Sequence, residues 1–324
     1  MALPTREYGT TGLTTTSIGL GMAALGRPGY INVGHHDDLG DTSVEAMRAR
    51  ACDVLNAAYA GGVRHVDTAR SYGRGEEFVG DWLREQGHQD VLVSSKWGYT
   101  YTADWTVDAD VHEVKNHSVG TFRRQIAESR RFLDGNPHIY QIHSATMDSG
   151  IFGDRDTLTA LSELAEEGVV IGLSVSGPGQ SEAIRRALEL SAAGDVPFAS
   201  IQATWNLYET AVGEALLAAK DAGWGVIIKE ALANGLLTSR GDAPEILTQM
   251  AAKHQVGIDA LAMAAASVQP FTPTVLSGAA VTEHLTANLQ ASQVSLSEQE
   301  LSTLRTLSVD SSDYWKRRGE LAWS

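Results

Sequence analysis

Ionisable and amide side chains stand at the ends of several short apolar segments of the chain. One such segment ends in Asp67, a second in Lys96, a third in His143 and a fourth in Lys229, and Gln202 lies near the end of another. Taken singly, such residues are usually turn residues, solvated charges or satisfied core groups. Their repeated placement after apolar segments indicates a shared site, where carboxylate, ammonium and imidazole groups can exchange protons and stabilise charge.

The segments that carry these residues alternate with helical patterns. Apolar residues recur at helical spacing in the intervening stretches, as at Met47, Ala51, Val54 and Ala58, and glycines such as Gly61 often follow them. We therefore expect eight β-strands separated by helices. The expected strands are Ser17–Met22, His65–Asp67, Val91–Lys96, Ile139–His143, Val169–Ser176, Ala199–Thr204, Gly225–Lys229 and Thr274–Ser277.

Alternating strands and helices pair in parallel through right-handed crossovers. A doubly wound open sheet also fits alternation, but eight units in 324 residues favour an α/β fold closed into a (β/α)8 TIM barrel, with residues 1–324 as one domain. The segment Arg6–Leu13 resembles a hairpin that could close the barrel bottom. All strands of such a barrel end at one mouth, so Asp67, Lys96 and His143 would converge there.

Three stretches are longer than ordinary loops, namely 26–44, 97–118 and 309–324. The last two are rich in aromatic residues, which disordered segments lack, so we expect ordered loops that wall a pocket at the C-terminal mouth. Arg317 and Arg318 would suit a polar, partly planar ligand or a sugar, but surface charges are the preferred interpretation. The residues expected to bind substrate are Trp97, Trp105, Trp205 and Trp315.

The overall composition restricts the class of partner. The formal net charge is −15, and an acidic surface repels nucleic acids and anionic membranes. The single cysteine, Cys52, excludes an intramolecular disulfide and favours a reducing compartment. The N-terminus does not resemble a signal peptide and no apolar run is long enough to span a membrane. We therefore expect a cytoplasmic protein with a small-molecule substrate; its oligomeric state is left open.

These residues, in this order, resemble the aldo-keto reductases. The segment Gly62–Gly73 is similar to the family's Asp-Thr-Ala…Tyr-Gly motif, and Glu76 and Gly80 continue it. Lys96 follows an apolar strand as the family's lysine does, and Ile139–His143 is similar to its histidine strand. Further similarity covers Ser17–Gly21, Ile171–Ser174, Gln202 and the stretch from Gly278 to Leu289. The resemblance runs from about Arg6 to Leu307, nearly the whole chain.

The resemblance implies NAD(P)(H)-dependent reduction of carbonyls, or oxidation of alcohols, on a (β/α)8 barrel. It implies Tyr72 as the proton donor, Lys96 and Asp67 as its supporting pair, and His143 as the residue that orients the carbonyl. A free tyrosine has a pKa near 10 and is a weak acid at neutral pH. We therefore expect Lys96 to lower the pKa of Tyr72.

The resemblance also implies a cofactor site, at which this chain departs from the family. Val175 follows Ser174 where the family usually has asparagine, and Lys229 stands where a tyrosine commonly stacks on nicotinamide. Lys229 and Glu230 suit either a salt bridge at the mouth or a contact to ligand. Ala280 and His284 replace basic residues of NADP-preferring members, so NADP(H) ranks only slightly ahead of NAD(H). The expected cofactor residues are Gly21, Asp67, Ser174, Gln202, Lys229, Leu232, Gly278, His284 and Asn288.

Two other functions fit parts of the pattern. A cofactor-binding sensor or subunit could share the fold, but the four catalytic positions argue against it, and a turnover assay would discriminate. A metal-dependent hydrolase would place His-x-His or carboxylate clusters at strand ends. His35-His36 is adjacent in a loop, and Asp104, Asp108 and His112 are irregularly spaced, so we expect no metal site.

Overall fold

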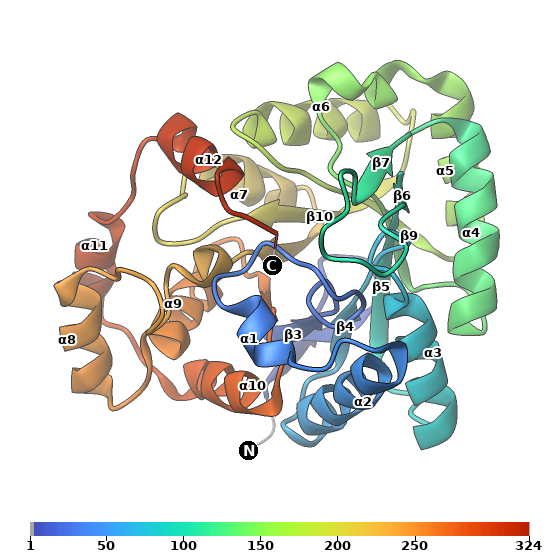
Figure 1. Cartoon of the computed structure of the whole chain (residues 1–324). Helices are drawn as coiled ribbons and strands as arrows, with labels where there is room; N and C mark the ends of the chain where they lie inside the picture. The colour runs from blue at the N-terminus through green and yellow to red at the C-terminus, as the bar shows by residue number, and fades with distance from the viewer. Residues whose placement is uncertain (1–2, 324) are drawn as a thin grey trace.

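A computed structural model describes residues 3–323, and its architecture is the expected (β/α)8 barrel. Eight parallel strands close on themselves in the order of the chain (Figure 1), and each expected strand is present with its bounds shifted by at most two residues. The barrel strands are β3 (Ile18–Gly21), β4 (His65–Asp67), β5 (Leu92–Trp97), β8 (Ile139–Ile142), β9 (Val170–Ser174), β10 (Phe198–Thr204), β11 (Gly225–Lys229) and β12 (Thr274–Ser277).

Helices cover the outer faces of the barrel strands, and others lie at the C-terminal mouth (Figure 1). They are α1 (His35–Leu39), α2 (Val44–Ala60), α3 (Gly75–Gln86), α4 (Val119–Leu133), α5 (Arg155–Glu166), α6 (Gln180–Ala192), α7 (Gly213–Asp221), α8 (Glu245–His254), α9 (Ile258–Ser267), α10 (Thr282–Leu289), α11 (Glu298–Arg305) and α12 (Ser311–Gly319). Short 3-10 turns lie at Met147–Ser149, Ile151–Gly153, Ala233–Gly235 and Gln290–Gln293. No helix of residues 3–323 is long and apolar enough to cross a membrane.

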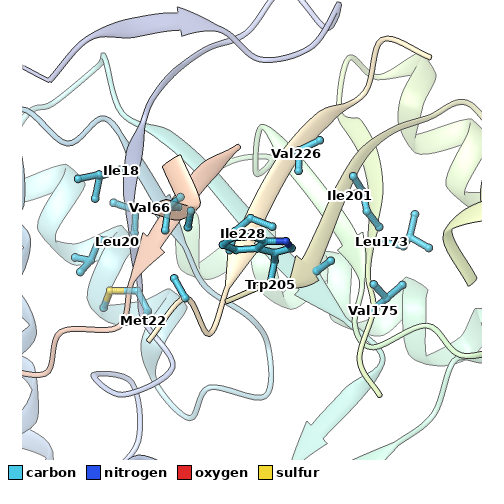
Figure 2. Packing of buried hydrophobic residues seen from close by; sticks show 14 of the residues in the cluster. Ile18, Leu20, Met22, Val66, Leu173, Val175, Ile201, Trp205, Val226 and Ile228 are labelled. Carbon is cyan, nitrogen blue, oxygen red and sulfur yellow. The ribbon is translucent and has the colours of Figure 1, made fainter. Parts of the chain in front are cut away.

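Successive side chains of each strand point to opposite faces of the barrel wall. One set packs outward against the helices in the main core, as Ile18, Leu20, Leu173, Val226 and Ile228 do (Figure 2). The alternate positions point into the barrel, where a smaller apolar cluster is built from Leu92, Ile139, Ile227, Leu276 and Tyr8. This alternation decides which strand-end residues can reach a site at the mouth.

The expected hairpin closes the bottom of the barrel. Strands β1 (Thr5–Glu7) and β2 (Thr14–Thr16) pair in antiparallel fashion. The Tyr8 hydroxyl lies 2.6 Å from Ser200 Oγ, and Arg6 donates to the carbonyl oxygen of Pro273. Both partners belong to the beginnings of barrel strands, so the hairpin covers the end opposite the site.

Within residues 3–323, the three long stretches contain secondary structure that we had not expected. The first holds α1, the second holds a hairpin of β6 (Tyr99–Tyr101) and β7 (Glu113–Lys115), and the third holds α12. All three lie at the C-terminal mouth, because each follows a strand end or packs on one. Arg318 of α12, for example, donates to Glu230 just after β11.

Candidate active site

A buried ion pair joins the ends of β4 and β5. Lys96 Nζ lies 2.5 Å from Asp67 Oδ2 and also donates to the carbonyl oxygen of Thr68 at 2.9 Å. The Lys96 side chain is 0% exposed and that of Asp67 is 3% exposed. The two strands pair in register, and Asp67 and Lys96 occupy inward positions, so the barrel itself brings the charges together.

Residues of the adjacent strand β5 and of β10, across the barrel, complete the hydrogen bonds of the Asp67 carboxylate. Its Oδ1 accepts from Ser94 Oγ at 2.7 Å and from Gln202 Nε2 at 2.9 Å. Burial lowers the pKa of Lys96, and Asp67 offsets that change by favouring the ammonium. A buried charge is tolerated only when it is paired and hydrogen-bonded, and this pair meets both conditions.

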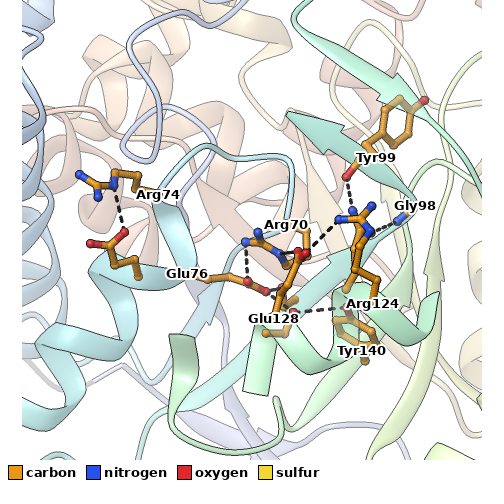
Figure 3. Close-up of polar contacts among 12 residues, drawn as sticks. Arg70, Arg74, Glu76, Gly98, Tyr99, Arg124, Glu128 and Tyr140 are labelled. Carbon is orange, nitrogen blue, oxygen red and sulfur yellow. Dashed lines mark hydrogen bonds and ion pairs between the residues drawn. The ribbon is translucent and has the colours of Figure 1, made fainter. Parts of the chain in front are cut away.

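A second polar network fixes the loop that carries Tyr72. Arg70 donates to Glu76 at 2.9 Å and to Glu128 at 3.0 Å, which ties that loop to α3 and α4 (Figure 3). The completely buried Glu76 also accepts from Ser95 at 2.5 Å and Ser129 at 2.7 Å. Ser95 is the outward neighbour of Lys96, so the loop of Tyr72 and the strand of Lys96 are held by the same carboxylate.

Tyr72 lies over this ion pair, with Lys96 Nζ 4.9 Å from the centroid of its ring. Burial raises the pKa of Tyr72 above its usual value of 10, and Asp67 raises it further. Our expectation of a lowered pKa is therefore wrong, because burial of the phenol outweighs the nearby cations and the Asp67 carboxylate adds to the increase. Arg27, 5.2 Å from the same ring, opposes the increase.

His143 follows β8 and faces Tyr72. The two rings are 5.6 Å apart between centroids and nearly perpendicular, at 82°. Burial lowers the pKa of His143 well below 6.5, and the cations Lys96 and Arg27 lower it further, so the imidazole is neutral at pH 7. Its Nδ1 lies 3.3 Å from Ser71 Oγ. When that hydroxyl donates, the proton is on Nε2, which is then a hydrogen-bond donor.

A cavity of about 1180 Å³, its open mouth included, begins at Asp67 and Tyr72 and extends outward across the strand ends. Its far end is lined by residues of α1, α9, α10 and the segment after β11. The expected cofactor residues that line it are Gly21, Asp67, Gln202, Lys229, Leu232, Gly278, His284 and Asn288.

These walls fit a dinucleotide in their chemistry. A side chain at Gly278 would meet no atom within 4 Å, so the backbone there is open to close approach by a ligand. Two groups that line the cavity, Asn234 Oδ1 and His35 Nε2, are buried without a hydrogen-bond partner among residues 3–323. Ser174 is the one expected cofactor residue that does not line the cavity; its Oγ accepts from the backbone of Ser144 at 2.8 Å.

Lys229 belongs to a charged cluster at the mouth. Its Nζ lies 2.7 Å from Thr204 Oγ1 and 3.4 Å from Glu230 Oε1. Glu230 in turn accepts two hydrogen bonds from Arg318 of α12, at 2.8 and 2.6 Å, and both cations hold the pKa of Glu230 at about 2, against the effect of burial. The structure therefore contains the predicted salt bridge between Lys229 and Glu230. Lys229 also lines the cavity, so a contact to ligand stays open.

None of the four tryptophans expected to bind substrate lines this cavity. Trp97 and Trp205 occupy outward positions next to inward Lys96 and Thr204, and they are 0% and 4% exposed. Trp97 packs on Phe122, and Trp205 on Phe271. Trp105 donates to the carbonyl oxygen of Thr42 beside a separate hollow, and Trp315 packs against the main core.

Sequence reasoning missed several cavity and mouth residues because they lie in loops without a regular pattern. Tyr30, Asp38 and Arg240 line the cavity. Arg27, which is 3% exposed, lies among the rings of Tyr72, Tyr30 and Trp323 and donates to Glu113 at 2.9 Å. The unusual length of the 26–44 stretch could have indicated Arg27, Tyr30 and Asp38, but no comparable signal points to Arg240.

Comparison with known proteins places these features in a family. The model of the aldo/keto reductase family matches residues 17–309. The chain is 25% identical to aldo-keto reductase str7 of Strobilurus tenacellus, over 96% of this chain and 94% of that protein. It is 26% identical to the NADH-specific methylglyoxal reductase of Escherichia coli, over 92% and 96%.

The solved structures agree on the fold. Aldo-keto reductase AKR11C1 from Bacillus halodurans, in its holo form, superposes with a TM-score of 0.71 at 21% identity, over 94% of this chain and 96% of that one.

Within residues 3–323, no group of three or more histidine, cysteine, aspartate or glutamate side chains could hold a metal ion.

Proposed function

The chain belongs to the aldo/keto reductase family, an oxidoreductase family, and we propose that it moves a hydride between a nicotinamide dinucleotide and a carbonyl or alcohol, with Tyr72 as the proton donor. The observation that carries this proposal is that Asp67 and Tyr72 line one end of a cavity, with Lys96 paired to Asp67 and His143 packed against Tyr72. Residues 1–324 would act as one domain.

The dinucleotide would be held by the strand ends that line the cavity. Gly21, Gln202 and Lys229 stand around the catalytic end, whereas Gly278, His284 and Asn288 line its outer part. When bound, the nicotinamide supplies or accepts the hydride. Gln202 is already oriented by its bond to Asp67, so it can present the rest of its amide group to a ligand.

Tyr72 holds the proton that the oxygen needs. Negative charge builds on the carbonyl oxygen as its carbon is reduced, and a proton donor and hydrogen bonds at that oxygen stabilise the charge. Because burial raises the pKa of Tyr72, the phenol stays protonated until an alkoxide, a stronger base, forms beside it. Lys96 then stabilises the phenolate, and Asp67 keeps that lysine charged and in place.

His143 would orient the carbonyl group. A neutral imidazole with its proton on Nε2 donates one hydrogen bond and leaves the proton on Tyr72 as the one that is transferred. Ser71 and the backbone of Trp97 hold this residue, the latter by accepting from His143 N at 2.8 Å. The Tyr72 hydroxyl and His143 Nε2 would both donate to the carbonyl oxygen, and these two hydrogen bonds would fix the position of the carbonyl group.

The proposed substrate is a small aldehyde, ketone or sugar, or the corresponding alcohol. Methylglyoxal is a reasonable first probe, because a relative 26% identical to this chain is named for its reduction. Action in the cytoplasm, without binding to nucleic acid or membrane, stays a prediction from the acidic composition and the single cysteine.

The test is the substitution Tyr72→Phe, which removes the proton and leaves the ring. Loss of a general acid lowers kcat by about 10²–10⁴-fold, whereas the dissociation constant of the dinucleotide should not change. Tyr101→Phe, the same substitution on the hairpin β6–β7, is the matched control and should retain full activity.

A Tyr72→Phe variant that turns over methylglyoxal and other aldehydes at the wild-type rate would refute the assigned role. If the wild-type protein binds neither dinucleotide in a direct titration, the oxidoreductase proposal itself fails. Both measurements use the same preparations.

A further inference from the structure

The end of the cavity farthest from Tyr72 is built from residues outside the barrel. Asp38 comes from α1, Arg240 from the segment after β11, and His284 from α10. Helices α1 and α10 lie side by side (Figure 1), with His284 Nε2 3.8 Å from Asp38 Oδ1. A dinucleotide with its nicotinamide at Tyr72 would place its adenosine half among these residues.

Residues 30–40, called the bridging segment here, join two sides of the cavity. Val33 N donates to the carbonyl oxygen of Asn234 at 3.0 Å. Arg240 donates to the carbonyl oxygen of Gly34 at 3.1 Å and to both carboxylate oxygens of Asp38, at 2.7 and 2.5 Å. The bridging segment therefore holds Asp38 at a defined place on the cavity wall.

At this end of the cavity, Arg240 forms a bidentate ion pair with Asp38. Both terminal nitrogens of Arg240 are bound to Asp38, so the guanidinium charge is already paired with a carboxylate. The remaining charged group, Asp259, is acidic, and its Oδ1 accepts from the backbone of Ala260 at 2.9 Å. The titratable groups of this end are thus two carboxylates, one paired arginine and the histidines His35 and His284.

The two forms of the nicotinamide dinucleotide differ only at the adenosine ribose. A 2′-phosphate needs an arginine or lysine whose donors are free. A free 2′-hydroxyl is instead recognised by a carboxylate that accepts its hydrogen bond. An engaged arginine and a fixed carboxylate at this end favour the hydroxyl.

We propose that Asp38 is a specificity-determining residue that selects NAD(H) over NADP(H). The inference rests on the proposed function, because it assumes that a dinucleotide occupies the cavity. The carboxylate of Asp38 accepts from the ribose hydroxyl in NAD(H), and it both repels a 2′-phosphate and offsets the charge of Arg240.

The test measures direct binding of NADH and of NADPH to the whole protein at fixed ionic strength. Quenching of tryptophan fluorescence is the readout. The wild-type protein should bind NADH at least about tenfold more tightly, the amount expected for one charge-assisted hydrogen bond of about 1.4 kcal/mol. Asp38→Asn should reduce that ratio by about tenfold, by weakening NADH and strengthening NADPH. Asp38→Ser should act in the same direction with a smaller side chain.

Asp37→Asn is the matched control, because Asp37 is the exposed neighbour of Asp38 in α1; it should leave the ratio unchanged. The inference is overturned if wild-type protein prefers NADPH, or if both Asp38 variants keep the wild-type ratio. Binding of neither dinucleotide by the wild type would overturn the proposed function instead, and with it this inference.

Discussion

The ion pairs at the two ends of the cavity differ in how deeply they are buried and in which elements carry them. At the catalytic end, Asp67 and Lys96 belong to adjacent strands, and their side chains are 3% and 0% exposed. At the outer end, Asp38 and Arg240 belong to segments that leave the barrel, and their side chains are 11% and 39% exposed. Both are ion pairs between an aspartate and a cation, yet only the first is enclosed by the fold.

This difference separates the reaction from the choice of cofactor. A buried pair supported by Ser94 and Gln202 has no alternative partner, so its geometry is fixed with the barrel. A pair at the solvent boundary contributes little to stability and can change by substitution without loss of the fold. On our account, the strand ends fix the reaction type and the bridging segment sets which dinucleotide is used.

The comparison predicts the largest stability change for Asp67→Asn. Removal of one partner of a buried ion pair leaves an uncompensated charge and costs about 3–5 kcal/mol. The free energy of unfolding, measured in urea, should fall by that amount, and Asp67→Asn combined with Lys96→Met should recover part of it. The matched change Asp38→Asn at the outer end should cost no more than about 1 kcal/mol. Equal losses at both ends would contradict the comparison.

The buried histidines predict that the free energy of unfolding changes gradually with pH. Burial lowers the pKa of His35, His65 and His117 to about 4 and that of His143 well below 6.5. In each case the unfolded chain takes up the proton near pH 6.5 and the folded chain does not. Stability is therefore fully present above about pH 6.5 and is lost as pH falls from there toward 4.

Each histidine should contribute up to about 1.4 kcal/mol per pH unit in that window. Urea unfolding at several pH values between 7.5 and 5 measures the sum. His35→Gln, in the bridging segment, should reduce the slope by one histidine's share. A free energy of unfolding that stays constant over this range would refute the prediction.

The smallest expected effect is the coupling between Asp38 and Arg240. A double-mutant cycle with Asp38→Asn and Arg240→Gln should give about 0.2–1 kcal/mol, and the value should fall at high salt, because the pair is partly exposed. A coupling above about 3 kcal/mol would mean that the outer end is as firmly built as the catalytic end, and the comparison would fail.

The same contrast explains what the sequence could predict. The barrel and its strands followed from apolar segments at regular intervals, and Asp67, Lys96 and His143 followed from their place at strand ends. The alternation of side chains along a strand could also have corrected the prediction that Trp97 and Trp205 bind substrate. Trp97 directly follows inward Lys96 and Trp205 directly follows inward Thr204, so both had to point into the helical layer.

Residues of the outer end could not be predicted in the same way. Asp38 and Arg240 are separated by 202 positions and meet because two loops converge, a contact that no local period encodes. The predicted direction of the pKa shift of Tyr72 was also wrong, because the sequence does not reveal how deeply the phenol is buried.

The most direct test of the central claim follows a deuterium atom. Wild-type protein is given NADH that carries deuterium at both C4 positions of the nicotinamide, together with methylglyoxal, and the alcohol product is examined by mass spectrometry. Our account predicts deuterium on the former carbonyl carbon, with label formation slowed by about 10²–10⁴-fold in Tyr72→Phe. Label that is absent from the wild-type product, or that forms equally fast in Tyr72→Phe, would contradict it.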